Sequence, residues 1–132
     1  DKIFLVETLE HLIPEKREEI LNEIYRLLKK DGILILTVPN NENFSLNEVM
    51  CPECGCIFHR YQHISKWNVK KVVDLFNSIN ISKIICKPIN FEKNQGFIGK
   101  YWDKIKELIN KLRGYIIIPK NIIYIGRKTK WI

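Results

Sequence analysis

Hydrophobic residues in the first part of the chain form two continuous runs that are separated by a helical repeat. Residues 3–6 form a short run that ends in polar Glu7 and Thr8, and residues 33–38 form a longer run. Both are typical of strands covered on both faces of a parallel sheet. Between them, Pro14 is a favoured first helical residue, and the apolar positions after it recur at helical spacing: Ile20, Leu21, Ile24, Leu27 and Leu28. The pattern predicts a right-handed βαβ unit and therefore an α/β fold.

The second part of the chain repeats the same alternation. Ser65 is placed to cap a helix whose apolar residues share one face: Val69, Val72, Val73, Phe76 and Ile79. Residues 81–89 then form a strand, and residues 97–112 form a helix with one apolar stripe and lysines elsewhere. Residues 115–118 and 121–128 predict one bent strand, or a strand preceded by an extended lead. We expect one domain over residues 1–132.

Residues 1–12, 27–40 and 121–128 form three segments that together resemble class I methyltransferases that use S-adenosylmethionine, of the methyltransferase type 11/12 kind. Residues 1–12 resemble the fourth strand of that family and its Glu-His-Leu signature. Residues 27–40 resemble the helix end, glycine turn, fifth strand and Pro-Asn exit, with Asp31 where Pro-Gly is commoner, and residues 121–128 resemble the antiparallel final strand. The resemblance implies a partial Rossmann-like fold: the C-terminal strands of a mostly parallel sheet, with flanking helices and an antiparallel last strand.

The family's methyl-donor site is only partly represented in this sequence. In that family a glycine-rich turn after the first strand and an acidic residue after the second hold the donor, and no such glycine-rich loop occurs here. The chain starts at Asp1 and its only methionine is Met50, so we expect an incomplete domain cut from a longer protein. The expected function is part of a methyltransferase for a small-molecule or lipid-like acceptor, inactive as this fragment. We expect weak or no binding of S-adenosylmethionine.

The loop after residues 3–6 carries the candidate site residues that the resemblance implies. In this fold the loop lies at the carboxyl ends of the strands, where ligands bind. Glu7 and Thr8 are expected to line the donor pocket, and His11 to orient or deprotonate the acceptor. The alternative is that Glu10 and His11 cap or brace the following helix.

A cysteine and histidine cluster predicts a structural zinc site within a knuckle-like insertion over residues 47–65. Cys51 and Cys54 have the two-residue spacing that lets a tight turn point both thiolates at one ion. His59 and His63 are spaced so that a helical turn would present both rings on one side, which completes a Cys2His2 set. Cys56 is an alternative ligand to one histidine.

The same cluster is also part of a family resemblance, and it has one metal-free alternative. Some methyltransferases carry a similar Cys-Pro-x-Cys-Gly-x-x-Phe-His-Arg stretch after the fifth strand, and that resemblance places the cluster over the active face, with Arg60 and Tyr61 available to the acceptor. The alternative is a metal-free loop in which Phe58 packs and the histidines form local hydrogen bonds.

Charge is distributed unevenly along the chain. The net charge is +7, with 7 Lys and Arg against 11 Asp and Glu in residues 1–65, and 15 against 4 in residues 66–132. We interpret the basic half as a solvated face and do not expect nucleic acid as the partner. The helix over residues 97–112 could dock on a membrane surface, but packing on the sheet or over the acceptor site is the favoured interpretation.

The sequence has no long apolar span and no leader pattern, and its cysteines cluster as in metal sites, so we expect a cytoplasmic protein. Unpaired strands at the open side of the sheet predict a homo-oligomer, or cover by the missing N-terminal half. The competing hypothesis is a non-enzymatic, zinc-containing binding or assembly module that uses the basic half.

Overall fold

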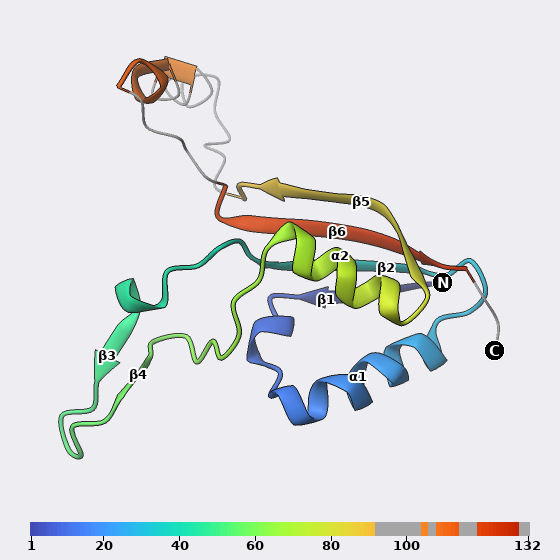
Figure 1. Ribbon diagram of the computed structural model, residues 1–132, viewed down its shortest axis with the longest axis horizontal. Coiled ribbons are helices and arrows are strands. Elements are labelled where there is room, and N and C mark those ends of the chain that lie inside the picture. The colour runs from blue at the N-terminus through green and yellow to red at the C-terminus, as the bar shows by residue number, and fades with distance from the viewer. Residues whose placement is uncertain (92–103, 106–107, 114–118, 130–132) are drawn as a thin grey trace.

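The computed structural model describes residues 1–91, 104–105, 108–113 and 119–129 and is built on a four-stranded sheet (Figure 1). The strand order is β1 (Lys2–Val6), β2 (Ile33–Pro39), β6 (Asn121–Lys128) and β5 (Ile81–Ile89). β1 and β2 are parallel, and β6 is antiparallel to both β2 and β5. β1, β2 and β5 therefore run in one direction and only β6 is reversed. This arrangement confirms the predicted α/β fold with an antiparallel last strand.

Two helices pack on one face of the sheet. α1 (Pro14–Leu27) begins at the predicted proline. α2 (Val69–Ser78) follows the cysteine-rich segment, residues 47–65. α2 is capped by Asn68, whose side chain accepts a hydrogen bond from the Lys71 amide at 2.8 Å. The prediction that Ser65 caps this helix is wrong, because the Ser65 hydroxyl instead donates to the carbonyl of Glu10 at 3.3 Å.

The hydrophobic core lies between these helices and alternate residues of the strands. Leu34, Leu36 and Val38 of β2 are fully buried, together with Ile122 and Tyr124 of β6. They pack in one cluster with side chains of the two helices, including Leu21, Ile24, Val72 and Phe76. The opposite face stays largely open in the described part of the chain, where Phe4 is 62% and Val6 57% exposed.

A short hairpin projects away from the main sheet (Figure 1). It consists of β3 (Glu48–Met50) and β4 (Ile57–His59), which pair in antiparallel fashion. Two 3-10 helices, η1 (Leu9–His11) and η2 (Phe44–Leu46), follow β1 and β2. The hydrophobic pattern of the sequence predicts none of these short elements, because three residues are too few to show the repeat of a helix or a strand.

The predicted helix over residues 97–112 falls mostly outside the described residues. Residues 104–105 and 108–112 are helical, and Leu108 and Leu112 are exposed. Residues 115–118, for which an extended segment is predicted, lie outside the described residues. Within the described residues no helix could cross a lipid bilayer, because none is both long and apolar enough.

Candidate functional site

Polar side chains collect where the parallel strands end. Glu7 follows β1, Asn40 follows β2, and Asn121 opens the reversed strand β6 at the same edge. The Asn40 amide group donates to the carbonyl of Pro119 at 2.9 Å, and the Asn121 side chain donates to Glu7 Oε2 at 3.3 Å. The site edge is therefore joined by side chains from three strands.

Glu7 is held in an uncommon backbone conformation at this edge. Its φ angle is +44°, in the left-handed region that a non-glycine residue seldom adopts. The Glu7 amide donates to the Thr37 carbonyl at 3.0 Å, and its Oε1 atom is buried without a hydrogen-bond partner. The Thr8 hydroxyl donates to the Val6 carbonyl at 2.8 Å. Glu7 thus has a free hydrogen-bond acceptor where the methyl donor is predicted to bind. The Thr8 hydroxyl is already hydrogen-bonded to the end of β1.

Glu10 and His11 lie in η1, immediately beyond this edge. Neither of them caps α1, whose N-cap is Ile13 and receives no side-chain cap. The Glu10 carbonyl instead accepts hydrogen bonds from the amides of Ile64 and Ser65, which brings the end of the cysteine-rich segment against η1. Burial raises the pKa of the Glu10 carboxyl above its ordinary value.

The histidines of the cysteine-rich segment face Glu42 rather than the cysteines. His59 and His63 are stacked with ring centroids 4.7 Å apart, and both contact the carboxylate of Glu42, which follows β2. The rings of His63 and His11 meet edge to face at 4.9 Å. Glu42 has no motif in the sequence and becomes visible as a site residue only in three dimensions.

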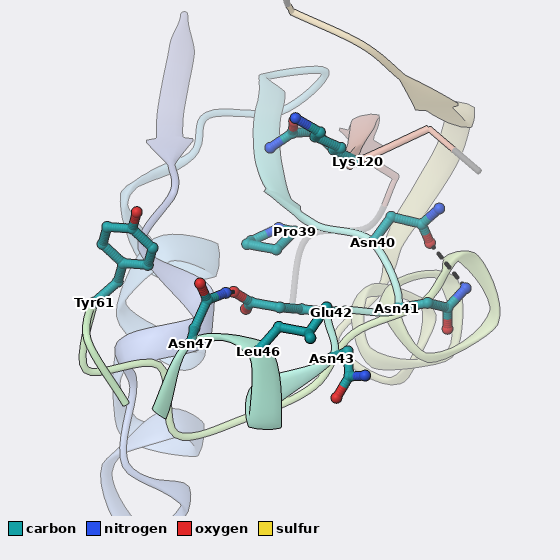
Figure 2. Close-up of a pocket in the computed structure, with 10 residues that line it drawn as sticks. Pro39, Asn40, Asn41, Glu42, Asn43, Leu46, Asn47, Tyr61 and Lys120 are labelled. Carbon is teal, nitrogen blue, oxygen red and sulfur yellow. Dashed lines mark hydrogen bonds between the residues drawn. The ribbon is translucent and has the colours of Figure 1, made fainter. Parts of the chain in front are cut away.

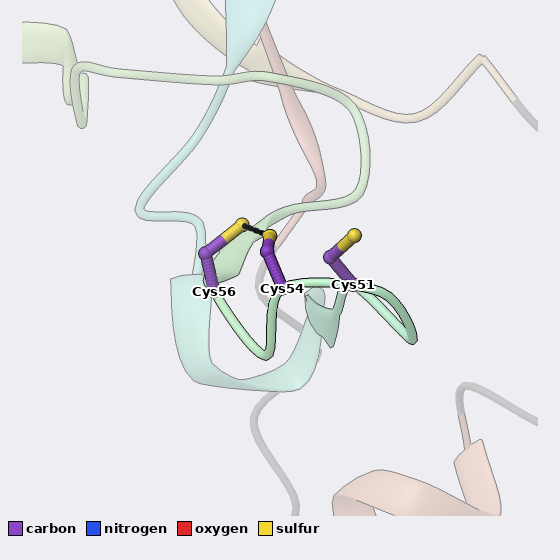
Figure 3. Close-up of side chains that lie close together, drawn as sticks. All are labelled: Cys51, Cys54 and Cys56. Atoms are coloured by element: carbon purple, nitrogen blue, oxygen red, sulfur yellow. Dashed lines mark hydrogen bonds between the residues drawn. The ribbon is translucent and has the colours of Figure 1, made fainter.

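The three neighbouring cysteines form a separate cluster at the turn of the hairpin (Figure 3). The sulfurs of Cys54 and Cys56 are 3.1 Å apart, and the Cys51 amide donates to the Cys56 carbonyl at 2.9 Å. Gly55, with φ +72°, permits the tight turn. The backbone amide of Cys56 beside Cys54 lowers the pKa of the Cys54 thiol. The arrangement can present three sulfur ligands to one soft metal ion.

The structure divides the predicted Cys2His2 set between two clusters. Cys51 and Cys54 meet as predicted, with Cys56 as the third member, whereas His59 and His63 group with Glu42. The reason is the hairpin register, which pairs His59 with Glu48 and leaves the cysteines beyond the last pair, Met50 with Ile57.

A cavity of about 560 Å³ opens beside the end of β2 (Figure 2). Its walls combine amide side chains with a few apolar groups, and Tyr61 closes one side. The lining residues are Pro39, Asn40, Asn41, Glu42, Asn43, Leu46, Asn47, Tyr61, Lys120 and Asn121. Arg60, the other residue predicted to be available to the acceptor, is not among them.

Comparison with known proteins agrees with the fold. Residues 1–36 match a family model described as a methyltransferase domain. A search of curated proteins found no match.

Solved structures with this fold include three methyltransferase structures. A Burkholderia thailandensis 1,6-didemethyltoxoflavin-N1-methyltransferase, with 1,6-didemethyltoxoflavin and S-adenosylhomocysteine bound, is 13% identical with a TM-score of 0.61, and the match covers 98% of this chain and 44% of that one. A SAM-dependent methyltransferase from Archaeoglobus fulgidus is 16% identical with a TM-score of 0.61, and the match covers 97% of this chain and 59% of that one. A third match is a chain of the complex between the Haloferax volcanii Trm112 methyltransferase activator and a methyltransferase. It is 14% identical with a TM-score of 0.58, and the match covers 100% of this chain and 55% of that one.

The chain has the class I methyltransferase fold and spans about half the length of these solved structures. The resemblance inferred from residues 1–12, 27–40 and 121–128 is confirmed at the level of the fold. The metal ligands, the site residues and the insertion over residues 47–65 stay predictions.

Proposed function

We propose that this chain is the C-terminal part of a methyltransferase that uses S-adenosylmethionine and acts on a small-molecule or lipid-like acceptor. The observation that carries the proposal is the convergence of Glu7, Asn40 and Asn121 at the carboxyl ends of the parallel strands, beside a cavity. Ligands of open α/β sheets bind at such an edge. S-adenosylhomocysteine, which is bound in the Burkholderia structure, is the product that such a donor leaves.

Glu7 and Thr8 are assigned to the donor side. The buried, unpartnered Oε1 of Glu7 is an acceptor that a hydroxyl or amino group of the donor would satisfy. We also propose that residues 1–132 alone bind the donor weakly, because the glycine-rich loop that cradles it in this family has no counterpart in the sequence.

His11 is assigned to the acceptor. Its Nδ1 atom lies 3.2 Å from the Gln62 carbonyl, which can only accept a hydrogen bond, so the neutral ring carries its proton on Nδ1. The lone pair on Nε2 is then free to orient or deprotonate an acceptor group.

The cavity beside β2 is assigned to the acceptor itself. Five of its lining residues are asparagines, which provide donors and acceptors for a polar group, and Pro39, Leu46 and Tyr61 provide apolar surface for a carbon skeleton. This mixture supports a small organic molecule or a lipid-like one. A small heteroaromatic molecule is bound in the Burkholderia structure.

A structural zinc ion is proposed at the cysteine cluster. Cys51, Cys54 and Cys56 offer three thiol groups to one point, and thiolates are preferred zinc ligands. The ion would hold the hairpin turn in one conformation at the end of β3 and β4. Free thiols in this arrangement fit a reducing compartment such as the cytoplasm.

A methyl-transfer assay tests the proposed function. The protein that contains residues 1–132 is incubated with radiolabelled S-adenosylmethionine and with fractionated small-molecule and lipid extracts. Transfer of label to a small or lipid-like compound is the expected result, and His11→Ala should lower kcat by about 10²–10⁴-fold, the usual contribution of a general base. Lys70→Gln, at an exposed position on α2, is the matched control and should leave kcat unchanged.

The second candidate is a non-enzymatic, zinc-containing module that binds a partner through its basic half. The observation that favours it is the hairpin, which carries exposed Cys54 and Cys56 away from the sheet. Salt-sensitive binding of nucleic acid, together with no methyl transfer to any fraction, would favour this module over the enzyme.

A further inference from the structure

A second cluster of metal-ligating side chains lies apart from the cysteines. Two groups of three, Glu10 with His11 and His63, and Glu42 with His59 and His63, share one histidine. Within each group the ligand atoms lie within 4.8 Å of one another. The members come from η1, from the loop after β2, from the end of β4 and from the segment that follows β4, so the fold rather than a local motif brings them together.

Glu10 is the most unusual member of the cluster. Its side chain is 1% exposed, and both carboxylate oxygens are buried without a hydrogen-bond partner. Its Oε1 atom lies 4.0 Å from Nε2 of His11 and 4.0 Å from Nε2 of His63. A buried carboxyl group is stable only when it is protonated, paired, hydrogen-bonded or bound to a metal. Neither imidazole hydrogen-bonds to the Glu10 carboxylate, since both lie 4.0 Å away. A bound cation would supply the missing partner.

Hydrogen bonds fix both imidazoles so that their lone pairs face this carboxylate. Nδ1 of His11 lies against the Gln62 carbonyl and Nδ1 of His63 against the Glu42 carboxylate. Both partners are acceptors, so each neutral ring has its proton on Nδ1 and its lone pair on Nε2. A carboxylate or carbonyl behind each histidine is the usual second layer of a metal site.

His59 supports the site but is not a ligand. Its Nδ1 atom accepts hydrogen bonds from the amides of Tyr61 and His63 at 3.3 and 3.2 Å. Its proton is therefore on Nε2, which lies 3.4 Å from Glu42 Oε1. The lone pair of His59 is thus occupied by backbone amides, its Nε2 atom has no hydrogen-bond partner, and Glu42 is the group that orients His63.

We propose that Glu10, His11 and His63 bind a divalent transition-metal ion. Two imidazoles and one carboxylate suit zinc, iron, cobalt, nickel or manganese better than calcium or magnesium. Ligand atoms at about 2.1 Å from one ion lie about 3.0–3.4 Å apart. Glu10 Oε1 is 4.0 Å from each histidine and all three ligand atoms lie within 4.8 Å of one another, so side-chain shifts of about 1 Å bring them to one ion. The His11 side chain is 40% exposed, which gives the ion a path from solvent. Three protein ligands leave positions open for a substrate or water.

This inference goes beyond the proposed function, because metal binding is measured without donor or acceptor. It also separates His63 from the cysteine cluster, to which the sequence pattern assigned it. When the ion is bound, the His11 lone pair faces the ion, so the ligand role and the general-base role exclude one another.

Titration with Co²⁺ tests the proposal. In a background with Cys51→Ser, Cys54→Ser and Cys56→Ser, calorimetry should detect one equivalent of Co²⁺. Glu10→Gln should weaken binding more than about 100-fold, and Glu42→Gln, behind His63, about 10–100-fold. Glu48→Gln is the matched control, because Glu48 is an exposed carboxylate opposite His59 on β3 and outside the cluster, and it should change the affinity less than about twofold.

Thermal unfolding and absorption spectra keep the test decisive if a variant is unstable. Co²⁺ should raise the Tm of the cysteine-free background and leave that of its Glu10→Gln form unchanged. In the intact chain, thiolate-bound cobalt absorbs strongly by charge transfer, so Glu10→Gln should remove one equivalent of binding and keep that band. Unchanged Co²⁺ affinity in Glu10→Gln would overturn the proposal, as would no binding by the folded cysteine-free chain at millimolar Co²⁺.

Discussion

Gly126 lies where the last strand passes closest to the packed rings of the core. A Cβ atom there would lie 2.6 Å from the Tyr124 ring and 2.7 Å from the Ile81 side chain. Tyr124 cannot move away easily, because it is fully buried and stacked on Phe76 at 4.7 Å. Gly126→Ala should therefore lower the free energy of unfolding by about 1–3 kcal/mol, the usual range for overpacking. Urea denaturation measures the change, and an unaltered midpoint would contradict the close packing.

The Tyr124 hydroxyl is a second single group on which the core depends. It donates to the Ile81 carbonyl at 2.9 Å, and burial raises the pKa of Tyr124, which keeps the phenol protonated as a donor. Tyr124→Phe leaves that buried carbonyl without its partner and should cost about 1–3 kcal/mol in urea denaturation. Tyr61→Phe is the matched control, since Tyr61 is 55% exposed, and its unfolding free energy should be unchanged. Equal effects of the two changes would contradict the account.

The hairpin of β3 and β4 is the element that we expect to depend most on a metal. Its three-residue strands contain exposed Met50, Ile57 and Phe58, so little apolar burial stabilises the turn. Elemental analysis of protein purified without added metal should show that Cys54→Ser loses about one equivalent of zinc. Cys86→Ser should retain it, because Cys86 packs beside the core and belongs to no cysteine cluster in the described residues. Equal zinc content in both variants would contradict the cysteine site.

Long elements could be predicted from the sequence because their patterns are continuous. β5 and β6 have the predicted bounds, and α1 starts at the predicted Pro14. The start of α2 could not be predicted, because Ser65 and Asn68 are both good caps and only the contact of Ser65 with Glu10 distinguishes them.

The candidate site is predictable only in part. Glu7, Thr8 and His11 follow a recognisable strand, so their position at the strand ends could be inferred. Glu42 could not, because its contacts with His59 and His63 depend on how the loop after β2 folds over the hairpin. The spacing of His59 and His63 suggests two rings on one side of a helical turn. In the structure His59 ends β4, His63 follows in a non-helical segment, and the two rings stack and face Glu42 instead of the cysteines.

The part of the molecule that the structure describes has one covered and one open face. Phe4 and Val6 are exposed on the face opposite the helices, and β1 pairs only with β2 within the described residues. Such an edge and face favour association. We therefore expect residues 1–132 to form oligomers unless a further segment of the protein covers this face.

Sedimentation velocity tests this expectation. Phe4→Lys should shift the chain toward the monomer, because a charge on the open face disfavours its burial. Phe91→Lys, at a similarly exposed aromatic position beyond the end of β5, is the control and should leave the distribution unchanged. A monodisperse monomer at every concentration would contradict the expected association.

We propose that these residues form the acceptor-side part of a methyltransferase site and lack most of the donor's contacts. Calorimetric titration of residues 1–132 with S-adenosylmethionine tests it most directly. We expect a Kd of about 1 mM or weaker, which corresponds to a binding free energy of no more than about 4 kcal/mol. A Kd of about 1 μM would contradict it, because the donor would then have a complete site within these residues.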